Sequence, residues 1–128
     1  MTWQSAGLVA LGGAIGSVLR WALVILAAYR VGAGFPWGTL AVNVAGSFAI
    51  GVVAELAAGG ALSPPARIFL ATGILGGFTT FSAFSLETLL LARDGLPLSA
   101  LVYSVGSVVV GLGAAYVGTL LARAIAHV

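Results

Sequence analysis

Residues 76–88, GGFTTFSAFSLET, place a row of hydroxyl groups in a stretch that is apolar enough to cross a bilayer. Thr79, Ser82, Ser85 and Thr88 recur every three residues, so at about 100° per residue they form one slowly drifting stripe on a helix. The paired glycines and threonines predict a break in that helix. Broken backbone at membrane depth is tolerated only where protein or a cavity covers it, and its free carbonyls can coordinate a cation. The pattern therefore predicts hydroxyl donors that run from a helix break towards one face of the membrane.

Two other apolar segments carry polar groups at helical spacing. Asn43 shares a helix face with Thr39 and Ser47, because the three residues are four positions apart. Its NH₂ group can donate to an anion, or the three side chains can form a seam of hydrogen bonds between helices. Tyr103 and Ser107 are likewise four positions apart in the last apolar segment. Their hydroxyls can meet the stripe of the third segment.

Four further side chains each have two interpretations. Phe81 and Phe84 lie three positions apart beside the stripe; the electropositive edge of a ring favours a small anion, but a phenylalanine pair can also simply pack. Arg20 costs at least about 2.5 kcal/mol near a bilayer centre, so it faces protein or water. It either attracts an anion into a vestibule or bonds to carbonyls at a helix end. Glu87 is either a hydrogen-bond partner at a gate or an interfacial anchor.

Composition indicates an integral membrane protein. Of 128 residues, 61% are hydrophobic and 6% are charged, whereas an ordinary soluble domain is about 25% charged. The chain has no cysteine, and its only histidine, His127, lies in the C-terminal tail, so thiol chemistry is excluded and a catalytic or metal-bound histidine is not expected. The five arginines are scattered and form no basic patch, so we expect no nucleic-acid partner. No base, nucleophile or metal cluster suggests an enzyme.

Four segments reach the length of about 20 mostly apolar residues that a spanning helix needs, at residues 6–28, 38–57, 67–91 and 99–121. The short connections VGAGFP, AAGGALSPP and ARDGLP carry the turn signals and all four prolines. Pairs of small residues four positions apart allow close helix contact, and they occur at Gly12 and Gly16, Ser47 and Gly51, and Gly73 and Gly77. We expect an all-α membrane protein whose single domain, residues 1–128, has four transmembrane helices with a broken third helix.

The arginines that flank the spans do not fix an orientation. With four spans, Arg67 and Arg123 lie on one side of the membrane, and Arg30 and Arg93 lie on the other. Arginine bias between loops normally sets the orientation, and here the count is two against two. The count favours a protein that inserts both ways, which permits an antiparallel, dual-topology homodimer. The alternative is one orientation set by features outside the loops.

Three motifs together resemble the signatures of the Fluc family of fluoride channels. They are GGAIGSVLRW at residues 12–21, WGTLAVNVAGSFAIG at 37–51 and GILGGFTTFSAFSLET at 73–88, in three of the four spans and in the family's order. Two positions depart from the family's pattern. Ala83 stands where a threonine is common, and Gly111 stands where a serine is familiar. Both departures remove hydroxyls.

The resemblance implies an antiparallel, dual-topology homodimer with two pores beside a central, structural sodium ion. Backbone carbonyls of Gly76 and Thr79 would hold that ion. By motif, the resemblance places the fluoride pore at Asn43, Phe81, Phe84, Ser82, Thr88, Tyr103, Ser107 and Thr39. It places Glu87 and Arg20 at a gateway or vestibule. It further implies a multi-pass protein of the cell inner membrane that exports cytoplasmic fluoride passively and lowers its toxicity.

The residue types suit fluoride, and two other classes of protein remain open. Hydroxyls, an amide and ring edges replace hydration without a deep positive well, so the ion can leave again. A small dual-topology, proton-coupled exporter of drugs or cations would need a titratable carboxylate in a span, and Glu87 is the one candidate. A non-transporting packing subunit or a lysis peptide would need neither the helix break nor the single-face hydroxyls.

Overall fold

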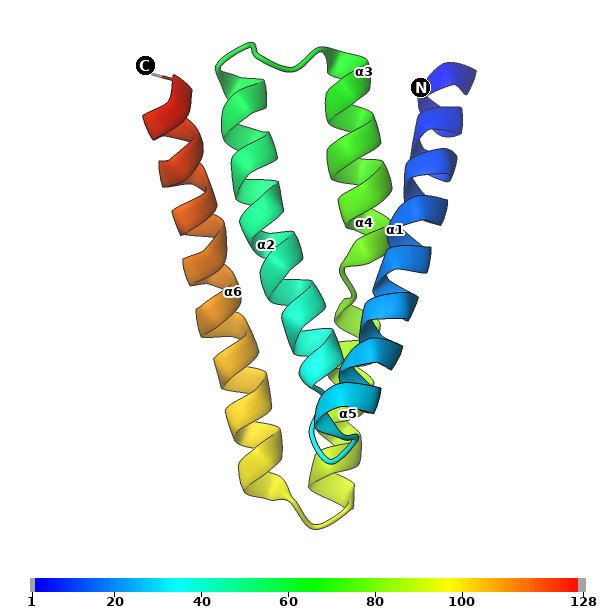
Figure 1. Ribbon diagram of the computed structural model, residues 1–128, viewed down its shortest axis with the longest axis vertical. Coiled ribbons are helices and arrows are strands. Elements are labelled where there is room, and N and C mark those ends of the chain that lie inside the picture. The colour runs from blue at the N-terminus through cyan, green and yellow to red at the C-terminus, as the bar shows by residue number, and fades with distance from the viewer. Residues whose placement is uncertain (1, 127–128) are drawn as a thin grey trace.

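The computed structural model describes residues 2–126, and the side chains of residues 2–125. His127 therefore lies outside the described residues. Four long helical runs cross the molecule in alternating directions, and α1 begins at the same end at which α6 finishes (Figure 1). The first, second and fourth runs are single helices: α1 (Trp3–Val31), α2 (Trp37–Ala58) and α6 (Pro97–Ala126). The third run has four parts: α3 (Pro64–Arg67), the π-helical η1 (Ile68–Leu75), α4 (Gly76–Phe78) and α5 (Phe81–Arg93).

Each run within the described residues is long and apolar enough to cross a membrane. The prediction of an all-helical protein with four spans is therefore confirmed. Every run extends one to five residues beyond the predicted span at each end, because helices continue into terminal turns that an apolar count leaves out. Thr2, for example, caps α1 by accepting a hydrogen bond from the Ser5 amide at 3.2 Å.

The prediction that all four prolines lie in connections is wrong for three of them. Pro64 and Pro65 form the first turn of the third run, behind the capping residue Ser63. Pro97 is the first residue of α6. A proline in the first turn costs no hydrogen bond, because the first amides of a helix have no partner inside it, and its fixed φ suits the helix. Only Pro36 precedes its helix, as the capping residue of α2.

Glycines hold the helices close together at two crossings. At the first, η1 and α4 pack against α1, and a Cβ atom on Gly12 would lie 2.9 Å from the Cα atom of Gly73. At the second, α2 packs along α6, and a Cβ atom on Gly51 or Gly118 would collide with a backbone oxygen of the other helix. Because a backbone cannot move aside as a flexible side chain can, these glycines fix how closely the helices approach.

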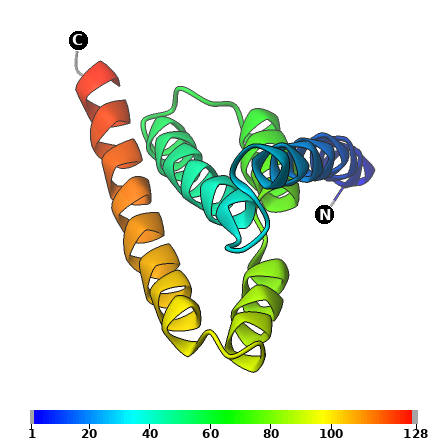
Figure 2. The same cartoon turned by 60° about the horizontal axis from the view of Figure 1, so that its bottom comes forward.

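The third run changes its packing partner halfway along. Its first half, η1 and α4, packs against α1, whereas α5 packs against α6. Figure 2 shows α5 turned away from α1 and connected to the start of α6. Between the two halves, Thr79 and Thr80 have extended backbone angles, with ψ of 158° and 117°. The polar residues of the predicted site lie around these two threonines.

The most deeply buried side chains include two that carry hydroxyls. Tyr103 and Thr39 are 1% and 2% exposed, as buried as Val42. Most large apolar side chains of the four runs face outwards instead, which is the arrangement that a lipid surrounding requires. The protein therefore has a partly polar interior and an apolar surface.

Candidate functional site

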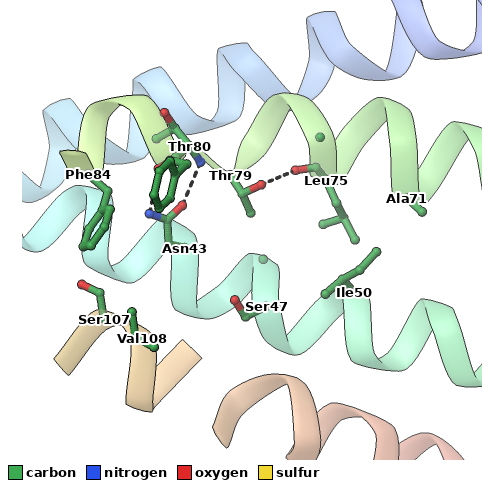
Figure 3. A pocket seen from close by; sticks show the side chains of 13 residues that line it. Asn43, Ser47, Ile50, Ala71, Leu75, Thr79, Thr80, Phe84, Ser107 and Val108 are labelled. Atoms are coloured by element: carbon green, nitrogen blue, oxygen red, sulfur yellow. Dashed lines mark hydrogen bonds between the residues drawn. The ribbon is translucent and has the colours of Figure 1, made fainter. Parts of the chain in front are cut away.

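The amide of Asn43 holds the extended segment between α4 and α5. The Thr80 backbone N–H donates to Asn43 Oδ1 at 2.8 Å, and Asn43 Nδ2 donates to the Thr80 carbonyl at 3.0 Å (Figure 3). Thr80 is only 9% exposed, so both backbone groups would otherwise be buried without partners. One of the two N–H groups of the amide is used in this way. The other is available to a further acceptor.

The same hydrogen bonds free a backbone carbonyl in α4. In a continuous helix the Thr80 N–H would donate to the Gly76 carbonyl, but it is already committed to Asn43. The next carbonyl, on Gly77, accepts from Arg20 Nε at 3.1 Å and from Ser17 Oγ at 3.4 Å. Arg20 therefore makes the contact with a helix-end carbonyl that its structural interpretation requires.

A hollow of about 390 Å³ lies beside the two threonines. Figure 3 shows side chains of α2, the third run and α6 around it. Of the described residues that line it, none is charged, and its polar side chains are Asn43, Ser47, Thr79, Thr80 and Ser107. The predicted pore residues Asn43, Phe81, Phe84 and Ser107 all line this one hollow.

Ser107 differs from the other hydroxyl residues of the hollow. Its Oγ atom is buried and has no hydrogen-bond partner among the described residues. A buried hydroxyl without a partner costs about 1–3 kcal/mol. Ser107 therefore has both a donor and acceptor sites to offer to something that enters the hollow.

The hydroxyl stripe of the third run is largely occupied by its own backbone. Thr79 donates to the Leu75 carbonyl at 2.9 Å. Ser85 and Thr88 bond to the carbonyls one turn earlier, at 2.9 and 2.8 Å. Ser82 Oγ lies 3.3 Å from the Thr80 hydroxyl. Serine and threonine in helices commonly bond to the preceding turn, so spacing on one face did not by itself leave these donors free.

A second polar cluster lies nearer the end of the bundle where the α1–α2 and α5–α6 connections are. Glu87 accepts from the Thr39 hydroxyl at 2.7 Å on one carboxylate oxygen and from the Tyr103 hydroxyl at 2.6 Å on the other. Thr39 and Glu87 also line a hollow of about 460 Å³, together with residues of both connections. Of the two predicted gateway residues, Glu87 therefore borders this hollow, whereas Arg20 lies against α4.

Five aromatic rings connect the two hollows. The sequence of contacts is Phe81, Phe84, Tyr103, Phe35 and Trp37, with centroid separations of 5.5, 5.4, 5.5 and 4.5 Å. Tyr103 belongs to the Glu87 cluster and also packs against Phe84 of the uncharged hollow. Sequence reasoning missed Phe35, which lies in a connection and has no helical spacing to reveal it.

The fold and the site are those of a small membrane protein of four spans with an uncharged hollow between them, which several polar side chains line. Residues 7–119 match the family model described as CrcB-like protein, Camphor Resistance (CrcB). The chain belongs to the CrcB-like family.

Several relatives carry the name Fluoride-specific ion channel FluC. The chain is 54% identical to one from Thermus thermophilus over 118 residues, which cover 92% of this chain and 94% of the relative. It is 52% identical to the one from Hyphomonas neptunium and 51% identical to the one from Rhizobium meliloti, covering at least 91% of this chain and 94% of each relative. The resemblance to the Fluc channels is confirmed, and these names favour an ion channel over an exporter or an enzyme.

Proposed function

We propose that this chain forms a passive, selective fluoride channel through which cytoplasmic fluoride leaves the cell, so that its toxicity is lowered. The observation that carries the proposal is the uncharged hollow beside Thr79 and Thr80, with an unpaired buried hydroxyl on Ser107. Relatives of this chain carry the name of fluoride-specific ion channels. In a site without full positive charge a small anion gains hydrogen bonds but can still leave, as conduction requires.

The proposed path runs from the uncharged hollow to the Glu87 cluster. Ser107 and the second N–H of Asn43 have capacity for hydrogen bonds to an anion. Phe81 and Phe84 offer ring edges beside them. The path continues along the third run and α6 with Ser82, Thr88, Tyr103 and Thr39, and Glu87 and Arg20 serve its gateway regions.

An antiparallel, dual-topology homodimer would complete the pore. Phe81 lines the hollow but is 78% exposed, so one copy of the chain leaves a proposed pore ring uncovered. The two-against-two arginine count allows the second copy to insert in the opposite direction. The extended residues between α4 and α5 would then form a functional break in the third helix, near the axis between the copies. We assign the assembly to the cell inner membrane.

A structural sodium ion fits the donor chemistry beside this break. No group of three or more histidine, cysteine or acidic side chains that could hold a metal is found among the described residues, and backbone oxygens beside the break can serve as ligands instead. The Gly76 carbonyl has lost its usual Thr80 donor to Asn43. Carbonyls of unwound helices coordinate sodium in membrane proteins. The backbone carbonyls of Gly76 and Thr79 would hold the ion. The same ion would bind these carbonyls in both copies of the chain and so link the copies.

Efflux from liposomes tests the proposed function. Purified protein is reconstituted, and fluoride and chloride release are followed with ion-selective electrodes under a potassium–valinomycin potential. We expect rapid fluoride release while chloride is retained. If well-incorporated protein releases neither anion, the proposal is wrong.

Glu87→Gln separates the channel from the exporter alternative. Proton-coupled export through Glu87 requires a titratable carboxylate, so it would disappear in this variant. A channel would retain passive, fluoride-selective efflux, at a reduced rate because the amide cannot accept from Thr39 and Tyr103 on both sides. Substrate uptake driven by a pH gradient, lost in Glu87→Gln, would support the exporter instead.

A further inference from the structure

Phe35 contacts the buried Tyr103 from the connection between α1 and α2. Its ring centroid lies 5.5 Å from that of Tyr103, and the two planes meet at 82°, which is a favourable edge-to-face geometry. Trp37 lies on Phe35 with a centroid separation of 4.5 Å. Both residues also line the hollow that Glu87 borders. Phe35 therefore packs between two aromatic residues, Trp37 and Tyr103.

Besides Phe35, a hydrogen bond and a second aromatic contact restrict the movement of the Tyr103 side chain. It is 1% exposed, its hydroxyl donates to Glu87 at 2.6 Å, and its ring packs against Phe84 at 5.4 Å. Glu87, Phe84 and Tyr103 itself lie on helices. Phe35 is the contact among these that comes from a connecting segment, directly after Gly34 and before Pro36. One of the three contacts that hold Tyr103 therefore comes from a residue outside the spans.

We propose that Phe35 is a positioning residue for conduction, which acts through Tyr103 on the ring of Phe84. With Phe35 in place, Tyr103 holds its hydroxyl on Glu87 and its ring against Phe84 at the uncharged hollow. Without Phe35, Tyr103 tilts towards the vacated space and Phe84 loses its support. The inference rests on the proposed function, because Phe84 matters to transport only if the hollow conducts an anion.

Two variants of Phe35 and one control test the role in transport. Phe35→Ala removes the ring, and Phe35→Trp retains an aromatic contact. Tyr29→Ala removes an 85% exposed aromatic side chain from the last turns of α1, near the same connection. Fluoride and chloride efflux are measured per reconstituted protein, and the maximal rate is separated from the half-saturating fluoride concentration.

The expected outcome is a change of rate and of selectivity in Phe35→Ala. Fluoride efflux should fall roughly two- to tenfold, the range that one aromatic pair contributes. Chloride release should rise relative to fluoride, because Phe84 no longer keeps its place. Phe35→Trp should restore both quantities, and Tyr29→Ala should change neither. An unchanged fluoride-to-chloride ratio in folded Phe35→Ala protein would overturn the inference, because a merely structural role changes only the amount of active protein.

A label at position 84 tests the positioning without transport. With 4-fluorophenylalanine incorporated at Phe84, we expect the ¹⁹F resonance to shift in Phe35→Ala, to return in Phe35→Trp and to stay in place in Tyr29→Ala. A resonance that does not move in Phe35→Ala overturns the inference. If the unmodified protein releases no fluoride, the proposed function fails, whereas the label still decides whether Phe35 positions Phe84.

Discussion

Replacing Asn43 by leucine removes both hydrogen bonds to Thr80 while retaining a side chain of similar size. In the structure the amide accepts from the Thr80 N–H at 2.8 Å and donates to the Thr80 carbonyl at 3.0 Å. Leucine can do neither. Both backbone groups of a residue that is 9% exposed then lose their partners. We expect the extended segment to open locally much more often.

The size of the effect follows from the two lost bonds. Leaving one buried backbone group unsatisfied costs about 1–3 kcal/mol, so the pair costs roughly 2–6 kcal/mol. At that cost, loss of the hydrogen bond from the Thr80 N–H alone accelerates local exchange of this amide hydrogen roughly 5- to 150-fold. The loss is also large against the total stability of a domain, about 5–15 kcal/mol.

Hydrogen–deuterium exchange followed by mass spectrometry measures this opening directly. The peptide that contains Thr80 should exchange faster in Asn43→Leu, and fluoride efflux should be lost. Ser47→Ala, one turn further along α2 in the same hollow, is the matched control and should not accelerate exchange at Thr80. If Asn43→Leu abolishes efflux while exchange at Thr80 stays the same, the hydrogen bonds to Thr80 are not what Asn43 is needed for. Its role would then be donation to the anion alone.

Three further predictions concern packing, the unpaired hydroxyl and sodium. Gly51→Ala should lower the thermal unfolding midpoint, because the new methyl group meets a backbone oxygen of α6 and overpacking costs about 1–3 kcal/mol; Gly113→Ala, where a Cβ atom meets nothing within 4 Å, should not, and equal losses would contradict this account of the crossing. Ser107→Ala should reduce fluoride efflux without lowering that midpoint, since it deletes a hydroxyl that has no partner among the described residues; a lower midpoint would reveal a structural bond instead. Preparation with a large organic cation in place of sodium should reduce efflux and the dimer fraction seen by size-exclusion chromatography, and readdition of sodium should restore both. Insensitivity to sodium would refute the proposed ion.

The spans could be predicted from the sequence because the bilayer imposes a simple length requirement. An apolar run of about 20 residues is helical in lipid, since a helix satisfies all of its backbone groups within the one segment. The helix ends were predicted less well, because Pro64, Pro65 and Pro97 were assigned to connections. Those prolines occupy first turns, a position that an apolar count does not distinguish from a loop.

The position of the extended residues could be predicted only approximately. The sequence indicated a break around the paired glycines and threonines, but Gly76 and Gly77 remain helical and the extended residues are Thr79 and Thr80. The reason is that Gly77 serves contact with α1, where a Cβ atom would lie 3.0 Å from the Cα atom of Gly13. Hydrogen bonds from a different helix fix the extended segment, and such a partnership is not visible in local sequence.

Long-range contacts account for the part of the candidate site that the sequence did not predict. Asn43, Phe81, Phe84 and Ser107 stood out by type and spacing, the resemblance implied that they belong to a pore, and they do line one hollow. Phe35 could not be selected in this way, because it lies in a connection and meets Tyr103 only after the chain has folded across two spans, α2 and the third run. Residue type and helical period carry information on which face a side chain occupies. They carry none on which connection covers that face.

The hydrogen bonds of Glu87 explain how a carboxylate is compatible with a proposed anion path. A bare carboxylate would repel fluoride, but each Glu87 oxygen already accepts from a hydroxyl, Thr39 on one side and Tyr103 on the other. A hydroxyl has one hydrogen to donate. If Thr39 or Tyr103 donates to an anion, its hydrogen bond to Glu87 is therefore lost. The carboxylate therefore competes with the anion for the same two donors. Binding at this end of the path is weakened by that competition, and weak binding is what allows an ion to leave.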